Sequence, residues 1–396
     1  MSRISNYDVG FKNNKVDYLL SITAMLQPVL ALIQYFLIDA IRMDADAANR
    51  VRVVLTALPI ILAMVFVVGR KPVLTVSTYG IVLFVLVFTV VLFPGRWKYM
   101  SDDVLKFTLP VVIPAGLCIA SVKNLAVLVR SMLLVSISAA IIGFLYAGLY
   151  VNGLFLIEGY NMGFSYALLF PTFVLITKNH WFWKVLAAVL MIEMMAIGSR
   201  GALLISIVYW GFVLLRTNKS FKGIILILIP VIVISIFFFD SIINSLTSLF
   251  DAIGINSRTL RLLTDDELLT HDSGRGEISI LTWQLIDNNP LFGNGVWADR
   301  QYLDTYCHNV ILELLLDFGY IGSFMILSVF LYKQIRIFKK IPSNHKTMYI
   351  MMLGLLLPLF FSSSYLISFN VGMFLGFGYL LSSLFKKRQY QDFQYE

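Results

Sequence analysis

Long apolar runs separated by short polar breaks occupy most of the chain. Residues 73–93 and 223–239 contain no charged side chain, and their lengths are close to the roughly 20 residues that a helix needs to cross a bilayer. A Gly-Ser-Arg-Gly break at residues 198–201 divides a further run that would be too long for one crossing. The pattern predicts an all-α, polytopic membrane protein with about twelve transmembrane helices. The predicted helices lie near 17–38, 51–69, 72–93, 104–122, 125–151, 160–177, 180–197, 201–215, 222–239, 309–332, 347–361 and 365–385.

One polar stretch, residues 240–308, is long enough to fold outside the membrane. Within it, residues 273–277 have the features of a helix start and residues 288–290 those of a helix stop. Apolar residues recur between them at helical spacing, so one face of this helix can rest on the membrane region. We therefore expect a nine-helix membrane region over 1–239, an external lobe with short helices over 240–308, and a three-helix membrane region with a cytoplasmic tail over 309–396.

Composition agrees with this class, and the distribution of charge gives an orientation. Hydrophobic residues make up 59% of the 396 residues and charged residues only 14%, which excludes an ordinary soluble domain. Most of the 31 Lys and Arg fall in segments that lie inside if the N-terminus is cytoplasmic, including 333–346 and 386–388. We expect both termini in the cytoplasm, the 240–308 loop outside, and an uncleaved first helix.

Several arginines stand where the outer surface is expected, and two of them suit phosphate binding. Arg200 follows an almost wholly apolar helix inside the glycine-flanked break, and a guanidinium can bind phosphate through two parallel hydrogen bonds. Arg275 opens the predicted loop helix, where free N–H groups and the helix dipole also favour an anion. The alternatives are a snorkelling helix-end residue for Arg200 and a solvated cation for Arg275. Arg258, Arg261 and Arg300 of the same loop are weaker candidates for substrate contact.

His308 is the candidate catalytic base, because it stands at the predicted outer end of the helix near 309–332. On an ideal helix Gly319 and Gly322 would share its face, and glycines there let another helix pack closely and fix the histidine. Asn309 beside it is a candidate substrate contact. The alternative for His308 is a capping or hydrogen-bonded side chain. With an ordinary pKa of about 6.5, the imidazole would be mostly neutral near pH 7.

Three carboxylates lie near these candidates. Glu193 is two turns before Arg200 on nearly the same face, which favours a structural ion pair, with substrate contact as the alternative. Glu313 and Asp317 lie on the helix face opposite His308, where two like charges repel each other. We expect these two to brace loop arginines.

Several other chemistries lack their sequence signals. The phosphate-binding GxxxxGK and the dinucleotide-binding GxGxxG are absent, which argues against ATP hydrolysis. The four histidines have no zinc spacing, and the acidic groups at 44–46 and 265–267 are typical of solvated loops. We expect no metal site, no cofactor and no nucleic acid partner.

Three segments together resemble the O-antigen ligase and polymerase superfamily. They are GSRGALL at 198–204, SGR through NPLFGNG at 273–295, and HN-x9-G-x2-G at 308–322. The resemblance covers about residues 160–332 and implies a GT-C-like glycosyltransferase of the bacterial inner membrane. Such an enzyme takes glycan from undecaprenyl pyrophosphate on the outer face. Carried over, Arg200 and Arg275 would hold the pyrophosphate and His308 would meet the acceptor hydroxyl.

Two enzymatic activities fit this resemblance, and both would be inverting and metal-independent. We favour polymerisation of lipid-linked repeat units of O-antigen, capsule or exopolysaccharide, because YNMGF at 160–164 resembles surface polysaccharide polymerases. The alternative is the ligase that transfers O-antigen to the lipid A core of lipopolysaccharide. A polysaccharide flippase is a third hypothesis, and it predicts internal symmetry and midplane charges. Expected partners are the lipid-linked donor, the glycan acceptor, membrane lipid, a chain-length regulator and a flippase.

Overall fold

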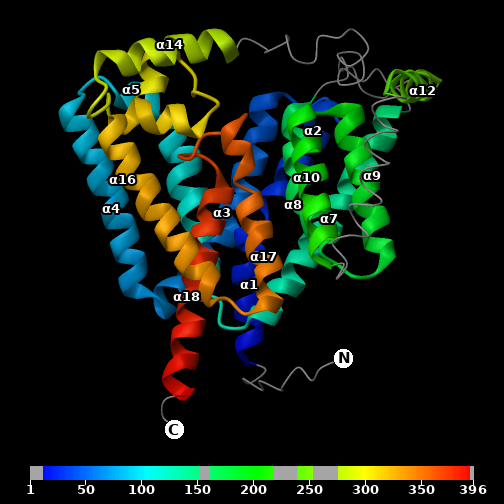
Figure 1. Cartoon of the computed structure of the whole chain (residues 1–396), viewed down its shortest axis with the longest axis horizontal. Helices are drawn as coiled ribbons and strands as arrows, with labels where there is room; N and C mark the ends of the chain where they lie inside the picture. Colours follow the sequence, from blue (N-terminus) through cyan, green and yellow to red (C-terminus); the bar gives the residue numbers. More distant parts are fainter. Residues whose placement is uncertain (1–11, 152–160, 218–238, 253–274, 393–396) are drawn as a thin grey trace.

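The fold is known from a computed structural model that describes residues 12–151, 161–217, 239–252 and 275–392. These residues form helices and no strand. Most helices stand side by side, and α14 (Arg275–Asn288) lies across one end of the assembly (Figure 1). The start of α1 and the end of α18 lie at the opposite end (Figure 1). The all-α class predicted from the sequence is confirmed for the described part of the chain.

The first predicted helix is two helices joined at a bend. Helix α1 spans Lys12–Met25 and α2 spans Gln27–Asp39, and their axes differ by 52°. Pro28, the second residue of α2, has no N–H to donate and its ring clashes with the carbonyl four residues earlier. The single helix expected over 17–38 is therefore two helices, although the apolar pattern is continuous.

The next helices present a broad apolar surface. Helices α3 (Ala45–Arg70) and α4 (Pro72–Leu92) match the predicted crossings, and most of their side chains are exposed. A continuous helical segment then runs through α5 (Trp97–Asp103), the π-helical η1 (Val104–Val112) and α6 (Ile113–Ala120). It begins earlier than the predicted helix at 104. Pro110 lies within the π-helical part. Proline has no N–H for the helical hydrogen-bond pattern, so the pattern changes where it occurs.

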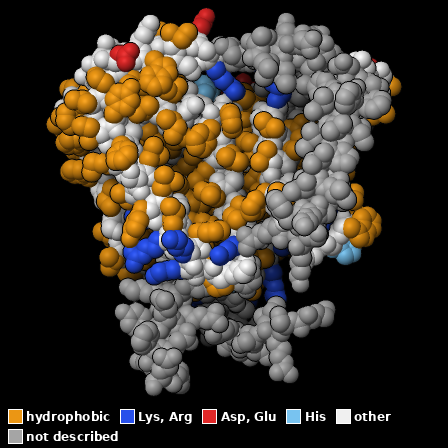
Figure 2. Space-filling view, in the orientation of Figure 1, with side chains coloured by type: hydrophobic (Ala, Val, Ile, Leu, Met, Phe, Trp, Pro, Cys, Tyr) orange, Lys and Arg blue, Asp and Glu red, His pale blue; other side chains and the backbone are white. Residues whose placement is uncertain are grey.

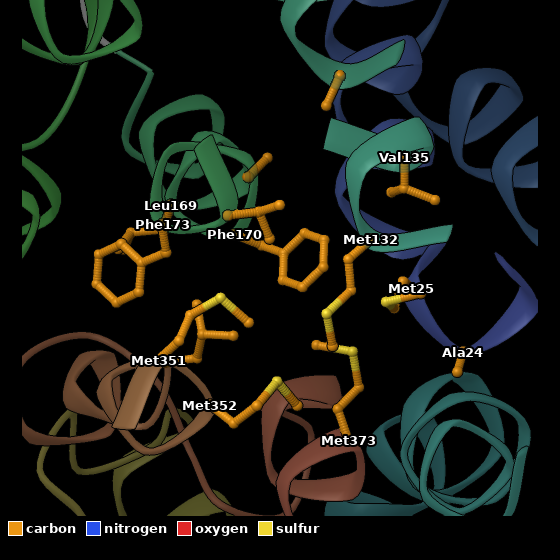
Figure 3. Packing of buried hydrophobic residues seen from close by; sticks show 14 of the residues in the cluster. Ala24, Met25, Met132, Val135, Leu169, Phe170, Phe173, Met351, Met352 and Met373 are labelled. Atoms are coloured by element: carbon orange, nitrogen blue, oxygen red, sulfur yellow. The ribbon is translucent and has the colours of Figure 1, made fainter. Parts of the chain in front are cut away.

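A central group of helices carries the core. Helices α7 (Leu125–Val151), α8 (Met162–Ile176) and α9 (Trp181–Ile197) are followed by α10 (Arg200–Thr217). The predicted break at 198–201 is thus confirmed. Figure 3 shows side chains of this core pointing toward one another from α1, α7, α8, α17 and α18. The buried residues labelled there include Met25, Met132, Phe170, Phe173, Met352 and Met373.

The remaining helices complete the bundle and its cap. They are α12 (Phe239–Ala252), α15 (Ala298–Leu303), α16 (Val310–Lys340), α17 (Ser343–Gly354), the 3-10 turn η2 (Leu357–Phe360) and α18 (Phe369–Asp392). Helices α14 and α15 pack on α16, and α15 also packs on α5. The predicted crossing at 222–239 lies almost wholly outside the described residues.

The surface has the form expected of a membrane protein. Within the described residues, five helices are long and apolar enough to cross a bilayer, or six if the bent α1–α2 pair counts as one. Figure 2 shows hydrophobic side chains over the middle of one face and Lys and Arg gathered toward the end away from α14. Four further apolar helices are shorter than a full crossing. The chain is a helical membrane protein.

Helix α16 is broken at Gly319, and a loop fills the break. Gly319 has φ of 63° and ψ of −172°, far from helical values. The break frees the carbonyls of Leu316 and Asp317, which accept hydrogen bonds from the N–H groups of Asn294 (2.7 Å) and Gly295 (2.9 Å). The loop after α14 therefore satisfies acceptors that a continuous helix would satisfy by itself.

Backbone N–H groups of α16 also donate hydrogen bonds to carbonyls of the loop. The N–H of Tyr320 donates to the carbonyl of Pro290 (2.7 Å), and the N–H of Ile321 donates to that of Leu291 (3.2 Å). A Cβ placed on Gly319 would lie 2.4 Å from the Leu291 carbonyl, so only glycine allows this approach. The NPLFGNG loop and Gly319, which the sequence presents as separate motifs, form one structural unit.

This geometry corrects the predicted role of the two glycines. His308 precedes the helix with φ of 55°, and α16 begins at Val310, so the ideal-helix face shared by His308, Gly319 and Gly322 does not exist. Gly319 packs against the loop, and a Cβ on Gly322 would meet Phe318 of its own helix at 2.7 Å. Neither glycine serves the close approach of another helix that the spacing had predicted.

Candidate active site

The first turn of α8 forms hydrogen bonds with residues 197–199, the break between α9 and α10 that positions Arg200. The Asn161 side chain caps α8 by accepting from the N–H of Phe164 (2.9 Å), and its own N–H donates to the Ile197 carbonyl (2.7 Å). One turn further on, Ser165 Oγ accepts from the N–H of Ser199 (2.9 Å). A Cβ on Gly198 would lie 1.5 Å from Ser165 Oγ, so glycine is required at this contact. Helix α10 then begins at Arg200.

Arg275 reaches the same turn of α8 from the cap. Its Nη2 lies 3.5 Å from Sδ of Met162, although the two residues are 113 positions apart in the chain. Ser362, which follows η2, donates its hydroxyl to Tyr166 Oη (2.6 Å). A Cβ on Gly201 would lie 2.7 Å from that same Tyr166 hydroxyl. The chain next to Arg200 and the side chain of Arg275 are therefore both brought to the start of α8.

His308 joins this group through Tyr306. The two rings have centroids 4.1 Å apart and are tilted by 49°. Tyr306 Oη donates to the carbonyl of Ser362 (3.2 Å), the residue that also bonds Tyr166. We call these side chains the α8 cluster. It consists of Met162, Tyr166, Arg275, Tyr306, His308 and Ser362, with Arg200 beside it.

The electrostatics of the cluster keep His308 neutral. Burial of the ring, the charge of Arg275 and the charge of Arg300 together lower the pKa of His308 to about 4. Among the described residues, its Nδ1 is buried and has no hydrogen-bond partner. The sequence alone had suggested an ordinary pKa, which is wrong because two guanidinium groups and desolvation oppose protonation. The imidazole is ready to accept a proton or a hydrogen bond.

Comparison with known proteins adds the family. Residues 185–327 match the family model described as O-antigen ligase. The matched segment runs from α9 through Arg200, Arg275 and His308 into α16. This match supports the resemblance to the O-antigen polymerase and ligase superfamily. The matched family is made up of glycosyltransferase-like enzymes. No curated protein and no solved structure matches the chain.

Arg300 is buried in an ionic network. Its guanidinium contacts Oδ2 of Asp103 (2.7 Å), Oδ2 of Asp299 (2.5 Å), Oε1 of Glu313 (3.0 Å) and Oγ of Ser364 (2.9 Å). Burial alone would lower the pKa of Arg300, but the three carboxylates outweigh it and raise that pKa. The predicted bracing of a loop arginine by Glu313 is confirmed. These contacts favour a structural role for Arg300 over substrate contact.

The second predicted brace, Asp317, has a different partner. It accepts a hydrogen bond from the Tyr365 hydroxyl (2.6 Å) and forms no salt bridge in the part of the chain that the structure describes. A buried arginine that the sequence did not single out, Arg96, instead bonds the carbonyls of Asn294 (2.8 Å) and Val296 (3.1 Å). Arg96 thus holds the same loop that pairs with α16.

Replacing Arg300 with glutamine should destabilise the protein by about 3 kcal/mol, because removal of one partner leaves buried carboxylates without compensation. Thermal unfolding of the purified protein in detergent measures this loss. Arg130→Gln, which changes an exposed arginine, is the matched control. An Arg300→Gln variant as stable as the control would contradict the structural role.

The other predicted site residues are placed as follows. Glu193 and Arg200 form no ion pair in the described structure, because α9 ends at Ile197 and Gly198 turns the chain (φ −129°, ψ −143°). Glu193 instead lies against Gly143 of α7, and its Oε2 has no hydrogen-bond partner within the described residues. The predicted ion pair is therefore wrong, and substrate contact of Glu193 stays a prediction.

Asn309 and two loop arginines are the remaining predicted site residues. Asn309 caps α16, where its Oδ1 accepts from the N–H groups of Ile311 (2.9 Å) and Leu312 (3.3 Å). Contact of Asn309 with substrate stays a prediction. Arg258 and Arg261 lie outside the described residues.

Proposed function

We propose that the protein polymerises lipid-linked oligosaccharide repeat units of O-antigen, capsule or exopolysaccharide by glycosyl transfer from undecaprenyl pyrophosphate. The observation that carries this proposal is the meeting of Arg275 and a neutral His308 around the first turn of α8, beside Arg200. Two guanidinium groups suit a diphosphate, and a neutral imidazole suits an attacking hydroxyl. A GT-C-like architecture and the inverting course belong to the same proposal.

The reaction is a single displacement at the anomeric carbon. The acceptor hydroxyl oxygen attacks that carbon, the bond to the diphosphate oxygen breaks, and its electron pair leaves with the diphosphate. Arg200 and Arg275 stabilise the negative charge that grows on the leaving oxygen. His308 takes the proton of the attacking hydroxyl. Because a bound diphosphate offsets the charge of Arg275, it raises the proton affinity of His308 when the substrate is in place.

The orientation is part of the proposal. We place α14 and the α8 cluster at the outer face of the bacterial inner membrane and both termini in the cytoplasm. The excess of Lys and Arg in the segments away from α14 supports this orientation. It also gives the site access to donor that has already been flipped to the outer leaflet.

The alternative activity is the ligase, and the match of residues 185–327 to the O-antigen ligase family favours it. A deletion strain separates the two activities. Loss of a polymerase leaves single repeat units on the surface glycolipid. Loss of a ligase leaves bare lipid A core and accumulated lipid-linked polymer. Transfer of glycan by the purified protein from a lipid-linked donor tests both against pure transport.

Replacing Arg275 with alanine should lower the rate of glycan transfer by about 10²-fold, because one cation facing the leaving diphosphate is lost. Arg275→Lys should recover only part of the rate, since lysine lacks the planar fork that binds two oxygens at once. Rates are measured with purified protein and lipid-linked donor. Lys98→Ala, an exposed change in α5, should leave the rate unchanged. Full activity of Arg275→Ala would remove the leaving-group role.

A further inference from the structure

Arg52, in the apolar helix α3, is hydrogen-bonded to neutral side chains and not to carboxylates. Arg52 lies about two turns from the start of α3 and is half-buried. Its Nη1 donates to Oε1 of Gln34 (2.8 Å) and its Nη2 donates to Oε1 of Gln27 (3.3 Å), both neutral amides. Within the described structure no carboxylate forms a salt bridge with Arg52. Burying a charged side chain in a membrane helix without an oppositely charged partner costs free energy. In membrane proteins such residues mark substrate paths.

The surroundings of Arg52 lead to the start of α8. The Tyr35 hydroxyl interacts electrostatically with Arg52 and with Asp39. That hydroxyl also rests on Gly163, where a Cβ would lie 1.9 Å away. Gly163 follows Met162, the residue that Arg275 contacts. Tyr35 therefore connects Arg52 to the start of α8, next to the α8 cluster.

Asp39, which shares the neighbour Tyr35 with Arg52, forms no salt bridge with Arg52 in the described structure. Asp39 is buried and bonded by the Tyr146 hydroxyl and by the Asn161 side chain. We call Gln34, Tyr35, Asp39, Arg52 and Asn161 the α2–α3 polar group. Together they offer amide, hydroxyl, carboxylate and guanidinium groups, which can bond the many hydroxyls of a sugar. Arg52 adds a positive charge with N–H donors to spare.

We propose that the α2–α3 polar group is a subsite for the sugar chain of the substrate, in which Arg52 binds an acidic substituent, a carboxylate or a phosphate, of the glycan. This inference rests on the proposed function. An anionic lipid headgroup would offer the same charge. However, Val54, two positions along α3, is 66% exposed and marks the lipid side, whereas Arg52 turns to α2. The geometry favours the glycan.

The test uses one variant, two forms of the glycan and one lipid background. Full-length protein in nanodiscs of neutral lipid is given lipid-linked glycan from wild-type cells, either native or with its carboxyl groups reduced and its phosphate substituents removed. Arg52→Gln should raise KM at least tenfold with the native glycan and less than twofold with the neutralised glycan. Arg52→Lys should fall between Arg52→Gln and wild type. Arg50→Gln, on the same helix but exposed, should match wild type with both.

Three results would overturn the inference. One is an equal loss with both glycans, which would mean a structural role for Arg52. Another is a glycan without any acidic group. The third is a charge dependence seen only when anionic lipid is added to the nanodiscs. If Arg52→Gln does not fold, Arg52→Lys decides by the same comparison. Failure of the proposed function is distinct, because wild-type protein would then transfer neither glycan, and binding of the released oligosaccharides to wild type and variant still compares the two forms.

Discussion

Replacing His308 with alanine should lower the rate of glycan transfer on the order of 10³-fold, because the attacking hydroxyl loses its proton acceptor. The loss should appear in kcat more than in KM, since proton transfer occurs in the transition state. Nδ1 of His308 makes no hydrogen bond within the described residues, so removal of the ring should change stability little. Single-turnover rates with purified protein and lipid-linked donor measure the effect.

Two controls make this result specific. His308→Gln keeps a polar side chain of similar size but cannot accept the proton in the same way, so it should be nearly as slow as alanine. Thermal unfolding of both variants should match wild type. If His308→Ala retains most of its turnover, the histidine only orients the acceptor and the base lies elsewhere.

The pH at which kcat/KM falls on the acidic side tests the environment of His308. Its lowered pKa, about 4, means that the free protein keeps the neutral imidazole until the pH falls through that value. The acidic limb of kcat/KM, which reports the free enzyme, should therefore lie near pH 4 and not near pH 6.5. The limb of kcat should lie at higher pH, because bound diphosphate offsets Arg275. In Arg275→Ala the limb of kcat/KM should also move upward. An acidic limb of kcat/KM near pH 6.5 that does not shift in Arg275→Ala would contradict this electrostatic account.

Replacing Gly319 with alanine should destabilise the protein by about 4 kcal/mol or more. The added Cβ would lie 2.4 Å from the Leu291 carbonyl, and the backbone is in a conformation that costs a non-glycine residue about 1–3 kcal/mol. Relief of the overlap must break hydrogen bonds between the loop and α16. The expected outcome is a large fall in the unfolding temperature in detergent, or no folded protein at all.

Gly211→Ala is the matched control for that substitution. Gly211 lies in α10, and a Cβ there would meet nothing within 4 Å, so alanine should be neutral or slightly stabilising. A Gly319→Ala variant as stable as Gly211→Ala would show that the loop and the helix do not pair as described.

The sequence predicts most of the fold because lipid demands long apolar helices. Runs such as α4 and α7 are visible without any structure. The bend at Pro28 was missed, since the apolar pattern continues through it and hides the missing N–H. The break at Gly319 was missed for a different reason: the hydrogen-bond partners of the residues around it are 22 to 30 positions away, and helical spacing gives no sign of them.

The site was predicted only where charge or helix position gives a signal. Arg200 and Arg275 stand out because cations are rare at the outer boundary, and His308 stands out because it lies at the outer end of a predicted helix. Tyr166, Tyr306 and Ser362, which join them, are common residue types in an apolar chain and gave no such signal. Arg52 was passed over because it follows a polar loop and reads as an ordinary helix-end residue.

Backbone hydrogen bonds between residues 290–295 and α16 fix the carboxyl end of α14. Arg275 stands at the opposite end of α14, roughly 20 Å away for a helix of this length, where its side chain contacts Met162 of α8. By simple geometry, a tilt of about 10° would carry the start of α14 through ~3.5 Å. A movement that small is enough to close a guanidinium onto a diphosphate and to withdraw it once the sugar has left.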